Sequence, residues 1–128
     1  MLHVLALAHE AGVPLAIEEF GELGKSVPLI GNLSPHGPHH MVDLHEVGGV
    51  PRVMQMLIEA GLAHGDCLTV TGKTWAENLA ALALPALPPE QGVLLPLATP
   101  LSAPGNHILV LKGNLAPLSA VIKVRELA

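Results

Sequence analysis

The stretch LIEAGLAHGDCLTVTGKTWAENLA, residues 57–80, joins the end of one predicted helix to the start of another. Its first residues complete an apolar pattern of helical period that follows the Gly-Gly-Val-Pro turn of residues 48–51, and Gly61 is placed to end that helix. Its last residues contain Thr74 and Glu77 at the spacing of a capping box, which predicts a second helix. This part of the chain is therefore expected to be helix-rich.

Shorter elements surround this stretch. Apolar residues at helical spacing predict one helix that ends at Gly12 and another, with an acidic face, that ends near Gly24. Residues 27–30 are predicted to form a short buried strand. Residues 68–71 alternate apolar and hydroxyl side chains between two glycines, which also predicts a short strand.

The second part of the sequence has a different character. Residues 85–105 are rich in proline and have no helical period, which predicts a linker. Segments rich in Val, Ile and Leu at residues 107–111 and 120–124 flank a Gly-Asn dipeptide, as in a β-hairpin. We therefore expect an α/β chain in which helix-rich residues 1–84 are followed by a linker and by strands within residues 106–128.

The composition narrows the classes of protein. The 128 residues are 50% hydrophobic and 13% charged, with a net charge of -5, so the chain has material for a core and too little charge for disorder. The acidic balance and the presence of only two aromatic residues, Phe20 and Trp75, argue against a nucleic-acid partner. Prolines interrupt the most apolar stretch, so no transmembrane segment is expected. The single cysteine, Cys67, predicts a reducing, cytoplasmic setting.

A dense group of histidines lies within and just after a loop of turn-forming residues. It offers five side chains of types that bind zinc or iron: His36, His39, His40, Asp43 and His45. A structural zinc site needs four ligands held by rigid neighbours, whereas proline and glycine leave the geometry of this loop open. The group is therefore either a metal site or, as we expect, a polar loop at a pocket or surface.

Two shorter motifs admit both a chemical and a structural interpretation. His64 lies near Cys67, and an imidazole can activate a thiol, but a lone cysteine beside an apolar segment is typical of a small buried hydrophobe. The Gly-Lys-Thr of residues 72–74 ends like a phosphate-binding loop, yet Cys67 stands where that motif needs glycine. What remains is a turn before a helix, where Lys73 and the helix amides favour an anion, although helix capping alone explains Thr74.

The amino-acid sequence of residues 57–80 resembles a stretch of the dihydroxy-acid dehydratase and sugar-acid dehydratase family. Three further blocks resemble that family in the same order: LHVLALAHEAGVPLAIEEF (residues 2–20), MVDLHEVGGVPRVM (residues 41–54) and LKGNLAPLSAVIK (residues 111–123). The resemblance therefore covers nearly the whole chain. The Val-Gly-Gly-Val-Pro and HGDCLTVTGKT segments look more like the branched-chain dihydroxy-acid dehydratases than the 6-phosphogluconate branch.

The resemblance implies a hydro-lyase that converts a 2,3-dihydroxy acid to a 2-keto acid with an iron-sulfur cluster and magnesium. The family's cluster cysteines, magnesium ligands and catalytic serine belong to motifs that this sequence does not contain, and Cys67 matches none of them. We therefore expect an internal fragment, with no catalytic residue, metal ligand or cofactor on this chain.

The resemblance also implies an architecture and a pocket. Residues 1–84 would be the C-terminal part of an α/β/α domain, and residues 106–128 the first strands of a β-barrel domain. The candidates for facing a small acid substrate are His40, Asp43, Thr71 and Lys73. The alternative is that the aspartate caps a helix, the threonine belongs to a strand, and the lysine is a solvated charge.

Three functions compete on this sequence. The first is a piece of a dihydroxy-acid dehydratase that is inactive alone. The second is a non-catalytic, self-associating or binding module on the same scaffold, because a core cut from a larger fold leaves apolar surface uncovered. The third, weaker one is a small histidine-site metalloprotein. A homo-oligomer or the remainder of a dehydratase is the expected partner.

Overall fold

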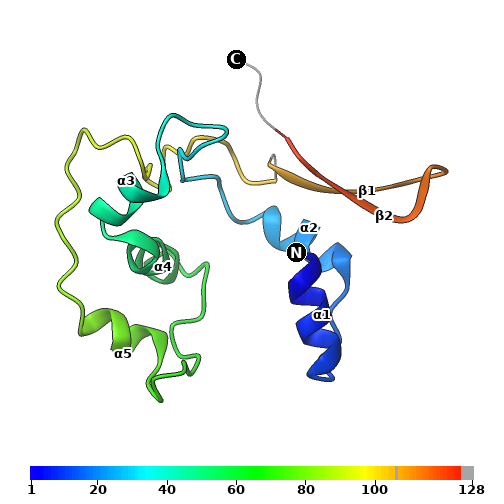
Figure 1. The fold of residues 1–128 in the computed structure, drawn as a ribbon, viewed down its shortest axis with the longest axis horizontal. Helices are drawn as coiled ribbons and strands as arrows, with labels where there is room; N and C mark the ends of the chain where they lie inside the picture. Colours follow the sequence, from blue (N-terminus) through cyan, green and yellow to red (C-terminus); the bar gives the residue numbers. More distant parts are fainter. Residues whose placement is uncertain (106, 125–128) are drawn as a thin grey trace. The chain divides into compact units, whose positions relative to one another are not determined.

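The computed structural model describes residues 1–105 and 107–124. Along these residues five helices are followed by a two-stranded antiparallel sheet (Figure 1). The chain forms two compact units, one made of Met1–Leu29 with the segment from Ser102 onward, the other of Ile30–Leu101. The predicted order of helices before strands is confirmed. No helix in the described part of the chain is long and apolar enough to cross a membrane.

The first unit begins with helices α1, Leu2–Glu10, and α2, Ile17–Gly24, as the apolar spacing predicts. Gly12 follows α1 with a φ of 67°, a left-handed conformation that glycine adopts without steric cost. The carboxylate of Glu19 accepts a hydrogen bond of 2.7 Å from the backbone amide of Ala16 and so satisfies a free donor at the start of α2.

The predicted hairpin completes the first unit. Strand β1, Ile108–Gly113, pairs antiparallel with β2, Ala116–Lys123, in a register that shifts between Leu111 and Gly113. Helix α2 contacts β1, and Lys112 of that strand forms an ion pair with Glu18 of the helix. The hydrogen bond from Lys112 lowers the pKa of Glu18, and a backbone hydrogen bond adds to the effect. Residues 125–128 and residue 106 of the predicted barrel segment lie outside the described residues.

The second unit contains α3, Met41–Glu46, α4, Gly49–Glu59, and α5, Trp75–Ala80. Helix α4 contacts both α3 and α5. Gly48 and Gly49, with φ of 108° and 64°, turn the chain between α3 and α4, and Gly61 ends α4 with a φ of 70°. The predictions for α4 and for the start of α5 are confirmed, while α5 is shorter than predicted.

The predicted strand at residues 68–71 is wrong. Only an isolated bridge between Leu68 and Thr74 forms there, and Leu68 and Val70 are exposed. The amide of Thr69 donates to the carbonyl of Lys73 over 2.9 Å, so the chain reverses before a strand can extend. Alternation of apolar and hydroxyl residues fits such a turn as well as a strand, because threonine hydroxyls bond locally to the backbone. The predicted strand at residues 27–30 likewise contributes only an isolated bridge, from Leu29 to Ser102.

The core of the second unit lies where α3 meets the proline-rich segment. Its buried members are Leu44, Val47, Val93 and Leu94. Residues 85–105 contain no helix or extended strand, but Val93 and Leu94 are 4% and 2% exposed. Part of the segment predicted as a linker is therefore core in this chain. Its role as a boundary between two domains of a longer fold remains a prediction.

Candidate functional site

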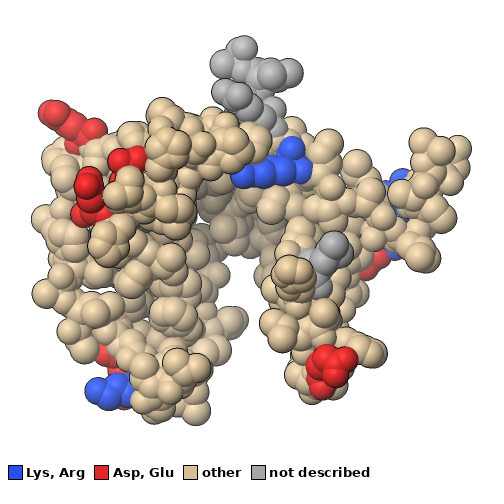
Figure 2. Space-filling view, in the orientation of Figure 1, with Lys and Arg blue, Asp and Glu red and all other residues tan. Residues whose placement is uncertain are grey.

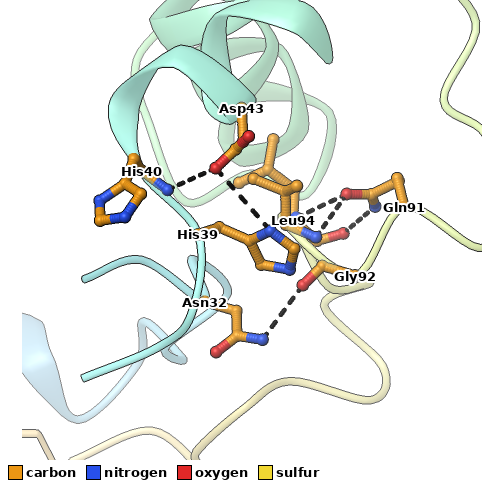
Figure 3. A network of polar contacts seen from close by, with 8 residues as sticks. Asn32, His39, His40, Asp43, Gln91, Gly92 and Leu94 are labelled. Carbon is orange, nitrogen blue, oxygen red and sulfur yellow. Dashed lines mark hydrogen bonds and ion pairs between the residues drawn. The ribbon is translucent and has the colours of Figure 1, made fainter. Parts of the chain in front are cut away.

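The first group of candidate residues lies at the start of α3 (Figure 3). The carboxylate of Asp43 accepts a hydrogen bond of 2.6 Å from the backbone amide of His40. The same oxygen is 4.0 Å from Nδ1 of His39, at the limit of an ion pair. The imidazole of His40 turns away from both of these side chains (Figure 3). Asp43 therefore has the role of a helix-start cap, which was the structural alternative for this residue.

The loop that leads into the histidine group is attached at Asn32 to the buried part of the proline-rich segment by hydrogen bonds that sequence reasoning missed. Asn32 donates from its side chain to the carbonyl of Gly92 over 3.2 Å and from its backbone amide to the carbonyl of Val93 over 2.9 Å. The side-chain oxygen of Gln91 accepts from the amides of Val93 and Leu94 over 2.7 and 2.8 Å (Figure 3). Asparagine in a turn is a recognisable signal, but no sequence pattern marks a glutamine that binds its own following backbone.

The second group surrounds the turn before α5. Its centre is Asn78, whose side-chain amide donates to the hydroxyls of Thr69 and Thr71 over 2.8 and 2.9 Å. The hydroxyl of Thr71 in turn donates to Oδ1 of Asn78 over 3.0 Å. The Lys73 side chain is exposed. Three polar side chains thus fix the turn that carries the lysine, and Asn78 was not among the predicted residues.

The predicted capping box begins α5. Oγ1 of Thr74 accepts from the amide of Glu77 over 3.2 Å, and Oε2 of Glu77 accepts from the amide of Thr74 over 2.7 Å. The hydroxyl of Thr74 also donates to that carboxylate, over 2.9 Å. The backbone hydrogen bond, followed by the hydroxyl hydrogen bond, lowers the pKa of Glu77 below the ordinary glutamate value of 4.5.

Replacing Thr74 with alanine is expected to raise the pKa of Glu77 toward its ordinary value, because the hydroxyl hydrogen bond to the carboxylate is lost. Since the folded pKa is lowered, the cap stabilises α5 above pH 4.5 and loses this effect as the pH falls through the folded pKa. An NMR titration of the Glu77 carboxyl measures the shift. Thr71→Ala is the matched control, because its hydroxyl bonds to Asn78 and not to Glu77. Equal titration of Glu77 in Thr74→Ala and the unmodified chain would contradict the cap.

The four predicted pocket residues fall into these two groups. His40 and Asp43 lie at the start of α3, and Thr71 and Lys73 lie in the turn before α5, with α4 between the two helices (Figure 1). Among the hydrogen bonds and ion pairs of the described residues, none joins the two groups. A pocket shared by all four residues therefore remains a prediction.

Two surface pockets of the first unit are lined by none of the four candidate substrate-side residues. One of about 440 Å³ is lined by α2, Gly105 and β1, and the other, of about 700 Å³, by the start of α1, Ile17 and the hairpin. The two ion pairs at the first pocket are Glu18 with Lys112 and Glu22 with Lys25, so its charges are already matched. In the described part of the chain, no three or more His, Cys, Asp or Glu side chains are grouped to hold a metal ion.

Comparison with known proteins confirms the resemblance. The family model described as dihydroxy-acid/6-phosphogluconate dehydratase, N-terminal, matches residues 1–78. The dihydroxy-acid dehydratase of Flavobacterium psychrophilum is 50% identical over 124 residues, which cover 97% of this chain and 22% of that protein. That of Mycobacterium tuberculosis is 50% identical over 123 residues, covering 96% and 21%. That of a Synechococcus strain is 51% identical over 125 residues, covering 97% and 22%.

The chain thus spans 21–22% of the length of these curated relatives and is homologous to one part of them. The matched family model covers more than half of the chain. The chain belongs to the dihydroxy-acid/6-phosphogluconate dehydratase family.

Proposed function

We propose that this chain is a piece of a dihydroxy-acid dehydratase, inactive alone, that serves the conversion of a 2,3-dihydroxy acid to a 2-keto acid in branched-chain amino-acid biosynthesis. The observation that carries the proposal is 50% identity over 97% of the chain to a protein of that name. The Mycobacterium tuberculosis and Synechococcus relatives have the same name. These names favour the dihydroxy-acid branch of the family over the 6-phosphogluconate branch.

The donor set of this chain does not fit an iron-sulfur cluster. Such clusters are held mostly by several cysteine thiolates, whereas the sequence has one cysteine, Cys67, which is exposed. In our proposal, residues outside this chain supply the cluster and magnesium of the family, and the catalytic step takes place on them.

In this proposal the chain contributes part of the scaffold of the enzyme and part of the wall of its substrate pocket. We propose residues 1–84 as the end of the α/β/α domain, a boundary that the family match over residues 1–78 supports. The proposal assigns residues 106–128 to the first strands of a barrel domain, and the described hairpin supports strand structure there. The setting we propose is cytoplasmic, since the single cysteine favours a reducing compartment.

Four side chains remain our candidates for the substrate side: His40, Asp43, Thr71 and Lys73. The exposed ammonium of Lys73 and the outward-turned imidazole of His40 are suited to a carboxylate. Asp43 and Thr71 are already hydrogen-bonded to neighbours, so in this proposal they hold the backbone that presents the other two.

Assays of the purified chain for a bound cluster and for catalytic activity test the proposal directly. We expect no bound iron, no acid-labile sulfide and no 2-keto acid from 2,3-dihydroxyisovalerate, because one cysteine cannot hold a cluster. Metal analysis, sulfide analysis and a keto-acid assay measure the three quantities. Cluster absorbance that is reconstituted on this chain alone, together with turnover, would contradict the proposal.

A self-associating or binding module on the same scaffold is the second candidate function. Exposed apolar side chains favour it, among them Leu7, Leu23, Leu68, Leu115 and Leu118. On the face shown in Figure 2, charged side chains cover only a small part of the surface. Apolar surface with so little charge favours association, either with further copies of the chain or with the rest of a dehydratase.

A further inference from the structure

We draw no further inference here: the strongest candidate, the exposed apolar surface of the β1–β2 hairpin with Leu111, Leu118 and Ile122, carries nothing because the structure does not show what covers it.

Discussion

Replacing Leu94 with alanine is expected to lower the free energy of unfolding of the second unit by about 2–5 kcal/mol. Leu94 is 2% exposed and belongs to the cluster formed with Leu44, Val47 and Val93. Truncation removes buried apolar surface and leaves a cavity among neighbours that cannot fully close it. Urea unfolding followed by the fluorescence of Trp75, the single tryptophan of the chain, measures the loss.

Leu68→Ala is the matched control for this substitution. Leu68 lies in the same unit but is 77% exposed, so its truncation is expected to change the free energy of unfolding by less than about 0.5 kcal/mol. Equal losses in the two variants would mean that residues 93–94 are not core and that the proline-rich segment only connects the elements on either side.

Replacing Gly37 with alanine is expected to cost the second unit about 1–3 kcal/mol, through steric overlap rather than a cavity. A Cβ at this position would overlap the carbonyl and side-chain oxygens of Asn32. Backbone cannot rotate out of the way as a flexible side chain can, so the loop must open. Since the amide of Asn32 bonds to the carbonyl of Val93, opening the loop also disturbs the core segment.

Gly31→Ala serves as the control, because a Cβ there meets only the Leu33 side chain at an ordinary 3.7 Å. We expect its urea midpoint to stay close to that of the unmodified chain, while the midpoint of Gly37→Ala falls. Amide exchange of Asn32 and Val93 reports the same event locally and should quicken only in Gly37→Ala. Unchanged stability and exchange in Gly37→Ala would show that the loop from Asn32 to Gly37 does not have the described geometry.

The elements that the sequence predicts correctly are those with local signals. Helix α4 has a complete apolar stripe and a glycine at its end, and α5 has the Thr74–Glu77 cap. The hairpin has two β-rich runs around a Gly-Asn pair, although its turn residues are Asn114 and Leu115, one position later than the dipeptide suggests. Each of these signals depends on residues that lie close together in the sequence.

The features that sequence reasoning missed depend on long-range contacts. The burial of Val93 and Leu94 comes from packing against α3, some fifty residues earlier, and a proline-rich segment without a period gives no sign of it. The threonine hydroxyls that accept from the Asn78 amide also fit the alternation of a strand, so the pattern at residues 68–71 does not distinguish a turn from a strand. The candidate pocket also depends on long-range contacts. Two of its residues lie at the start of α3 and two in the turn before α5, and α4 lies between these helices.

Formation of 2-keto acid by a grafted enzyme tests most directly whether this chain is a working piece of a dihydroxy-acid dehydratase. In this graft the 128-residue chain replaces the matching segment of the Flavobacterium psychrophilum dihydroxy-acid dehydratase, with which it is 50% identical over 124 residues. Under the proposed function, the other parts of that protein supply the cluster and magnesium ligands of the family.

We expect the graft to form 2-keto acid from 2,3-dihydroxyisovalerate at a rate within about tenfold of the parent, a difference of about 1.4 kcal/mol in the activation barrier. The isolated chain is expected to form none. The binding-module alternative predicts no turnover in either setting. A soluble graft that carries the parent's iron content and forms no 2-keto acid would contradict the claim that this chain is a working piece of a dihydroxy-acid dehydratase.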